Sequence, residues 1–119
     1  MLPRTHRLTR PDDFRRTIRA GIKAAGPSVI VYGVLAPGAE ADKPPRVGIT
    51  VSKAVGGSVV RHRVARVIRH AMAAQMSTLP AGSSWVIRAL PQAAGTNSVA
   101  SDVDAGVRAV LAKAEAQRR

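Results

Sequence analysis

The stretch that decides this fold is residues 53–70, which read KAVGGSVVRHRVARVIRH. A glycine pair at 56–57 is followed by a run in which apolar and basic side chains recur at helical spacing, which predicts a helix over residues 58–76. With about 100° of rotation per residue, one side of this helix carries Val60, Val64, Val67, Ile68 and Ala71. The opposite side carries His62, Arg63, Arg66, Arg69 and His70, with Arg61 near the boundary. The segment therefore predicts a helix that packs on a core and offers cations to a polyanion.

The flanking segments predict one α+β domain around this helix. Residues 46–52 alternate as in a strand, and residues 28–35, apolar at nearly every position, indicate a buried strand. With residues 36–45 as the loop between them, we expect an antiparallel pair. A third strand is expected over 84–90, a first helix capped by Thr9 and ending at Gly21, and a last helix capped by Ser98 or Ser101. The order α-β-β-α-β-α fits a single RNA-binding domain spanning 1–119, with residues 1–8 as a basic arm.

The charge balance indicates a polyanionic partner. The net charge is +12, and arginine outnumbers lysine. Arginine binds phosphates with two parallel hydrogen bonds and stacks on bases, which suits RNA better than simple solubility does. The chain has no cysteine, no apolar run long enough to span a membrane, and no signal-peptide pattern in residues 1–7, so we expect a cytoplasmic protein without disulfides.

The sequence offers little for catalysis by the protein itself. Its seven acidic residues fall in predicted helix caps, a loop and the C-terminal tail, so no carboxylate pair or metal site is predicted. His62 and His70 lie more than two helical turns apart, too far to share one phosphate as acid and base. The glycine pair lacks the spacing of a nucleotide-binding phosphate loop. From the residues alone, Phe14, Ile18 and Tyr32 are either core residues or a surface on which single-stranded bases stack.

Residues 46–69 resemble the signature of the bacterial ribonuclease P protein component. In that family a strand R-V-G-[FIL]-[ST]-V-S-K-K leads through V-G-N-A-V-x-R into R-N-R-x-K-R-x-x-R. Here residues 46–53 match the first part, and Val55-Gly56, Val59-Val60 and the arginines at 61, 63, 66 and 69 match the second. The opening Leu2-Pro3, His6-Arg7-Leu8 and Asp13-Phe14 are also similar, as is, more loosely, the segment 86–91.

Several positions depart from the family pattern. Ala54 and Ala65 stand where lysines are usual, and His62 stands for an asparagine. Gly57-Ser58 replaces Asn-Ala, and Ile18 occupies a position where an aromatic residue is common. These changes weaken single phosphate contacts and one stacking site, whereas the arginine framework is retained.

The resemblance implies the non-catalytic protein subunit of an endoribonuclease that removes the 5′ leader from precursor tRNA. The catalytic RNA would perform the hydrolysis and hold the Mg²⁺ ions, with no cofactor on the protein, and one monomeric protein would bind each RNA. Contacts to the catalytic RNA are implied for Lys53, Arg61, His62, Arg63, Arg66 and Arg69. Contacts to the leader are implied for Phe14, Ile18, Tyr32, Arg46 and Thr50.

The resemblance also implies a fold like domain 2 of ribosomal protein S5, a small mixed sheet packed on helices. Its β-α-β crossover is left-handed, although such connections are nearly always right-handed. Two alternatives from other classes stay open at this point. One is a structural RNA-binding protein of the ribosomal type, which the charge and size fit equally well. The other is an autonomous hydrolase that uses His62 or His70.

Overall fold

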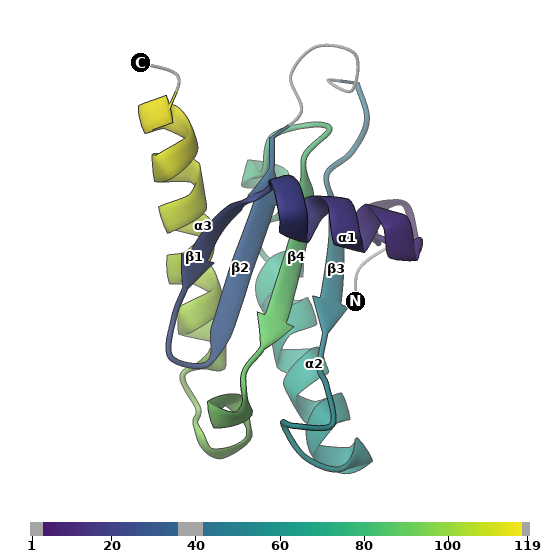
Figure 1. Cartoon of the computed structure of the whole chain (residues 1–119), viewed down its shortest axis with the longest axis vertical. Coiled ribbons are helices and arrows are strands. Elements are labelled where there is room, and N and C mark those ends of the chain that lie inside the picture. Colours follow the sequence, from purple (N-terminus) through teal and green to yellow (C-terminus); the bar gives the residue numbers. More distant parts are fainter. Residues whose placement is uncertain (1–3, 36–41, 118–119) are drawn as a thin grey trace.

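The computed structural model of the chain describes residues 4–35 and 42–117. Within these residues the chain forms a four-stranded mixed sheet with three α-helices, so the predicted α+β class is confirmed (Figure 1). The α-helices and strands are α1 (Pro11–Ala20), β1 (Ile22–Ala25), β2 (Val29–Val34), β3 (Arg46–Thr50), α2 (Ser58–Ala73), β4 (Ser84–Ala89) and α3 (Val99–Gln117). The short 3-10 helices are η1 (Arg4–His6), η2 (Met76–Thr78) and η3 (Pro91–Gly95).

The sheet is organised around β4. The strand order is β1-β2-β4-β3, with antiparallel pairing of β1 with β2 and of β2 with β4, and parallel pairing of β3 with β4. Three consecutive residues of β4, Trp85, Val86 and Ile87, are each 0% exposed. Because successive side chains of a strand point to opposite faces, this burial requires that both faces of the sheet be covered.

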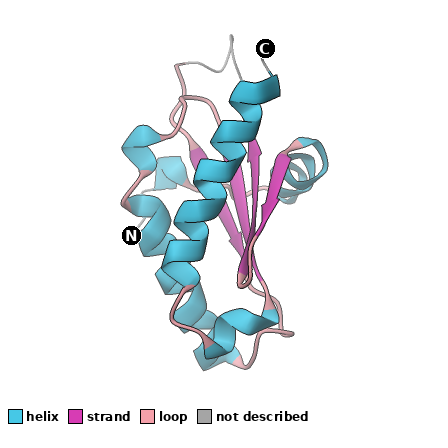
Figure 2. Cartoon of the chain, turned by 90° about the vertical axis from the view of Figure 1, so that its left-hand side faces the viewer, coloured by secondary structure: helices cyan, strands magenta, loops and turns pink. Residues whose placement is uncertain are grey.

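Helices cover the two faces unequally (Figures 1 and 2). The helices α2 and α3 lie on one face, where Val64, Ile68, Val103 and Val107 join Trp85 and others in the main core. The single helix α1 crosses the other face, where Leu8, Tyr32 and Val86 form a second small cluster with Phe14 and Ile30. The second face is therefore only partly covered.

The connection from β3 through α2 to β4 has the predicted left-handed crossover. In Figure 1, β3 and β4 both run downward, α2 lies behind the sheet, and the chain moves from β3 to β4 on its left. Figure 2 shows α2 and α3 on one side of the sheet and α1 on the other, in agreement with this path. The crossover places all of residues 58–73 on the face opposite to α1.

The prediction that the strands over 28–35 and 46–52 pair with each other is wrong. Strand β4 lies between β2 and β3 and pairs with both. Val29 and Val31 face the main core while Ile30 and Tyr32 face the second cluster, and β4 places Trp85 and Ile87 in the main core and Val86 in the second cluster. These two strands bury apolar side chains on both sides and take the central places, because there both backbone edges of a strand are paired.

Other local predictions also differ from the structure. Strand β1, with the sequence IKAA, was missed because four residues give too short an alternation, although Ala24 is buried. The first helix is capped at Arg10 rather than Thr9, without a side-chain hydrogen bond, and Pro11 occupies its first position. The predicted second helix is shorter, since α2 ends at Ala73. The last helix begins directly after Ser98, whose Oγ donates to Asp102 Oδ2 at 3.2 Å.

The described end of the predicted basic arm, Arg7 and Leu8, lies against β3. The Leu8 N–H donates to the Val47 carbonyl at 2.9 Å, and Arg7 forms a parallel bridge with Val47. Leu8 itself is buried in the second cluster. Residues 1–3 of the arm and 36–41 of the predicted loop fall outside the described part of the chain. The described residues 7–8 thus cover part of the outer edge of β3.

The close approach of α3 to β2 generates a stability prediction. A Cβ atom built on Gly106 would lie 2.4 Å from Val31 Cγ2 and 3.1 Å from its Cβ. We expect Gly106→Ala to lower the free energy of unfolding by about 1–2 kcal/mol, because overpacking against a stiff β-branched side chain outweighs the higher helix propensity of alanine. Urea unfolding measures this change. Gly95→Ala is the control, since a Cβ there meets nothing within 4 Å, and a gain in stability for Gly106→Ala would contradict the packing.

Candidate nucleic-acid interface

The first cationic surface belongs to α2 and the turn before it. We call Lys53, Arg61, His62, Arg63, Arg66 and Arg69 the α2 basic surface. Glycine suits position 56 of this turn, because φ there is 157° and a Cβ would lie 3.0 Å from Val60 Cγ1. Lys53, His62, Arg63 and Arg66 are exposed, whereas Arg61 and Arg69 are half-buried. The apolar side of the helix is anchored in the core by Val64, Ile68 and Met72.

The α2 basic surface wraps around the helix. The Arg63 guanidinium donates to the Ala94 carbonyl of η3 at 3.0 Å, so this side chain lies on the flank that faces η3. Helical geometry puts Arg61 and Arg69 on the other flank, with His62 and Arg66 between the flanks. Arg61 Nε is buried and makes no hydrogen bond to a described residue. The predicted residues are thus brought together on one helix, though they point in several directions.

Helix α2 carries positive charges and no negative side chain. Its N-terminus is capped by Gly57 without a side-chain hydrogen bond. Within residues 4–35 and 42–117, no ion pair involves any of its four arginines. Cations without neighbouring carboxylates attract a polyanion, and binding it releases the condensed counterions of the nucleic acid.

The opposite face of the sheet offers a second surface. The strand register arranges the side chains of this face in three rows. The first row holds Val34, Ser84 and Arg46, the middle row holds Tyr32, Val86 and Gly48, and the last row holds Ile30, Arg88 and Thr50. Phe14 of α1 covers the middle row, since a Cβ on Gly48 would lie 2.3 Å from the Phe14 ring. The last row is outside this cover, and its central residue Arg88 is exposed. We call Ile30, Thr50 and Arg88, with Phe14 and Ile18 beside them, the open sheet face.

The structure does not bring all five predicted leader contacts into one site. Phe14 is half-buried and Tyr32 is 6% exposed, both in the second cluster, whereas Ile18 is 39% exposed. Phe14 and Ile18 share one flank of α1, and Thr50 lies in the row that α1 leaves open. Arg46 lies on the other side of α1, next to Asp13. The role of these residues in leader binding stays a prediction.

Arg88 is a candidate residue that the sequence reasoning missed. It stands opposite both Ile30 and Thr50 in the register, in the middle of the open sheet face. A charged side chain in a central strand that is otherwise buried was the signal that could have identified it. Its guanidinium group can bind a phosphate that crosses the sheet.

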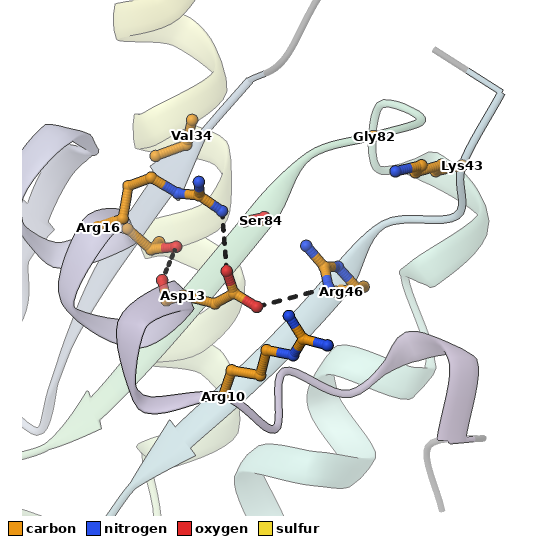
Figure 3. Close-up of a pocket in the computed structure, with 9 residues that line it drawn as sticks. Arg10, Asp13, Arg16, Val34, Lys43, Arg46, Gly82 and Ser84 are labelled. Carbon is orange, nitrogen blue, oxygen red and sulfur yellow. Dashed lines mark hydrogen bonds and ion pairs between the residues drawn. The ribbon is translucent and has the colours of Figure 1, made fainter. Parts of the chain in front are cut away.

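A separate hollow lies on the far side of α1 from the open sheet face (Figure 3). It has a volume of about 550 Å³ and is lined by Arg10, Asp13, Arg16, Thr17, Val34, Lys43, Arg46, Gly82 and Ser84. We call it the cationic cleft. The Asp13 carboxylate lies 2.8 Å from an Arg16 nitrogen and 3.7 Å from an Arg46 nitrogen. Arg10, Asp13 and Arg16 are spaced three residues apart, which places them on one flank of α1. This spacing is the signal in the sequence that could have identified the cleft.

Among the described residues, no group of three histidine, cysteine, aspartate or glutamate side chains is placed to hold a metal ion. None of the helices in that part of the chain is long and apolar enough to cross a membrane.

The fold and these surfaces define a class. A small mixed sheet with helices on both faces, an arginine-rich crossover helix on one side and exposed cations on the other is a nucleic-acid-binding domain. Comparison with known proteins gives the family. The family model described as Ribonuclease P matches residues 2–115, and the chain belongs to this family of ribonuclease P protein components.

Similar proteins support this assignment over nearly the full chain. The ribonuclease P protein component of Corynebacterium diphtheriae is 43% identical over 122 residues, which cover 99% of this chain and 100% of that protein. The component of Mycolicibacterium vanbaalenii is 50% identical over 92 residues, covering 77% of this chain and 76% of the relative. The solved ribonuclease P protein of Staphylococcus aureus has the same fold, with a TM-score of 0.71 at 24% identity, and the match covers 92% of this chain and 94% of that one.

Proposed function

We propose that the chain is the non-catalytic protein subunit of a ribonuclease P holoenzyme that acts in the cytoplasm. It binds the catalytic RNA through the α2 basic surface and the 5′ leader of precursor tRNA on the open sheet face. It thereby promotes endonucleolytic removal of the leader, which gives the mature 5′ end of the tRNA. The RNA performs the hydrolysis and holds the Mg²⁺ ions, and one protein binds one RNA.

The observation that carries this proposal is the position of α2 in a chain of this family. Its arginines form no ion pair with described residues, and the helix is held on the core by its apolar side. A helix anchored in this way presents its cations from fixed backbone positions, so no backbone order has to be gained on binding. This arrangement suits the dense phosphates of a folded RNA.

The open sheet face suits a single strand. Phe14 and Ile18 offer an apolar flank beside the sheet, and Arg88 offers a cation at the centre of the last row of side chains. Bases of a single strand can lie against the apolar flank while a backbone phosphate meets Arg88. Tyr32, which is buried in the second cluster, acts as the floor on which Phe14 rests.

The two surfaces lie on opposite sides of the sheet, so one small domain can bind both RNAs at the same time. With α2 behind the sheet and α1 in front of it, a docked catalytic RNA leaves the α1 side accessible (Figure 1). The protein then extends the substrate-binding surface of the holoenzyme toward the leader. Its cations also neutralise phosphates that Mg²⁺ would otherwise have to screen, so the greatest benefit is expected at low Mg²⁺.

Replacement of one arginine tests the binding of the catalytic RNA. We expect Arg66→Ala to flatten the slope of log affinity against log salt by about one unit, because one phosphate contact and its counterion release are lost. Filter binding of the protein to the cognate RNA across a salt series measures the slope. The control is Arg19→Ala, an exposed arginine of α1 on the opposite side of the sheet. Equal slopes for the Arg66→Ala protein and the wild type would show that Arg66 binds no phosphate.

A second variant tests the leader surface. We expect Arg88→Gln to weaken holoenzyme binding to precursor tRNA about fivefold and to leave binding of leaderless tRNA within about twofold, because an exposed charged contact contributes about 1 kcal/mol. Equilibrium binding of both substrates to the reconstituted holoenzyme gives the comparison. Arg108→Gln on α3 removes an exposed charge from the other face and serves as the control. A loss of affinity that is equal for the two substrates would place Arg88 outside leader binding.

A further inference from the structure

The cationic cleft is separated from the surfaces that the proposed function uses. Its lining comes from one flank of α1, from the ends of β2, β3 and β4, and from the loops that carry Lys43 and Gly82 (Figure 3). Phe14 and Ile18 lie on the other flank of α1. The α2 basic surface lies on the opposite face of the sheet. The cleft therefore has no role in the function proposed above.

The charges in the cleft are unbalanced. Among the described residues that line the hollow, three arginines, Arg10, Arg16 and Arg46, meet one carboxylate, that of Asp13. Asp13 can neutralise only one of these three charges. Within the described residues Arg10 forms no ion pair, and Figure 3 shows its guanidinium group beside the Asp13 carboxylate and the Arg46 guanidinium group. Neighbouring like charges repel each other, and a bound anion removes that repulsion.

The cleft is also preorganised. The Phe14 ring packs on Gly48, and Thr17 is buried on the side of α1 that faces the sheet, so packing holds the position of α1 over the sheet. The three arginines are consequently presented from rigid elements, two next to or within α1 and one at the start of β3. Because the backbone positions of these arginines are fixed, no backbone order has to be gained when an anion binds, which favours its binding.

The chemistry of the lining identifies a class of ligand. Guanidinium groups bind phosphate oxygens with paired hydrogen bonds, and the Ser84 hydroxyl on the floor of the cleft is a further possible donor. Among the described residues that line the cleft there is no aromatic side chain on which a base could stack. A volume of about 550 Å³ exceeds what a single small ion needs and accommodates a phosphate with part of its attached group.

We propose that the cationic cleft binds a phosphate group, which is supplied by an RNA strand either as a backbone phosphodiester or as a terminal 5′-phosphate. Asp13 has a defined role in this site. Its carboxylate lies between Arg16 and Arg46 and attracts both before the ligand arrives, while its negative charge opposes the incoming phosphate. This binding is independent of the open sheet face, so it goes beyond the function proposed above.

Inorganic pyrophosphate titrated into the full-length protein, followed by amide NMR shifts, tests the site. We expect saturable shifts at Arg46, Gly82 and Ser84, and an affinity lowered about tenfold or more in the Arg10→Gln/Arg16→Gln double variant, since each lost charged hydrogen bond is worth about tenfold. Asp13→Asn is expected to raise the affinity several-fold. Both variants alter exposed or half-exposed groups, and the amide spectrum itself shows whether each is folded.

The matched control is Arg15→Gln/Arg19→Gln, which removes the same charge from the exposed, outward side of α1. It is expected to leave the pyrophosphate affinity unchanged, as is Arg88→Gln on the open sheet face. An equal loss in the Arg15/Arg19 variant would overturn the proposal, because the effect would then be one of net charge. Weaker binding in Asp13→Asn, or shifts spread evenly over the surface, would overturn it as well.

Two RNA tetranucleotides of one sequence, with a 5′-phosphate or a 5′-hydroxyl, separate the two sources of phosphate. If the terminal phosphate is bound, the 5′-phosphorylated strand binds more tightly and the difference disappears in Arg10→Gln/Arg16→Gln. If a backbone phosphate is bound, both strands bind equally and the double variant weakens both. The proposal fails if the double variant weakens neither strand. The leader experiment with Arg88→Gln is unaffected by any of these outcomes.

Discussion

The parallel pairing of β3 with β4 is the constraint on which the rest of the molecule depends. Two parallel neighbours cannot be joined by a tight turn, so the chain has to return along the whole sheet before β4 begins. Helix α2 makes that return and packs through Val64 and Ile68 on the face opposite to α1. The arginines between these apolar positions are thereby held outward. The binding surface of α2 is a direct consequence of the topology of the sheet.

The second constraint on the binding surfaces is that α1 covers its face of the sheet only in part. One ten-residue helix, α1, crosses a sheet of four strands and leaves a different hollow on each side. Its apolar flank, with Phe14 and Ile18, borders the open sheet face. Its charged flank, with Asp13 and Arg16, borders the cationic cleft. A single short helix thus separates a surface suited to bases from one suited to phosphate.

Local patterns in the sequence predicted the elements well, whereas the arrangement between elements was only partly predictable. The periodicity of residues 58–70 and the alternation of residues 46–52 identified α2 and β3, because such patterns depend on near neighbours. The pairing partner of β3 is β4, which lies 38 positions further along the chain, and not β2, the strand that precedes β3 in the sequence. Arg88 and the cationic cleft were missed for the same reason, since both arise from strand register and from the crossing of α1. The left-handed crossover was predicted only through the family resemblance.

The central claim is that this protein contributes binding surfaces to a catalytic RNA and performs no hydrolysis itself. Reconstitution tests it most directly: leader cleavage of precursor tRNA is measured at low Mg²⁺ with the cognate RNA alone, the protein alone and both together. The account predicts no cleavage by the protein alone and a large stimulation when both are present. Cleavage by the protein without RNA, or no stimulation of the RNA by the protein, would contradict it.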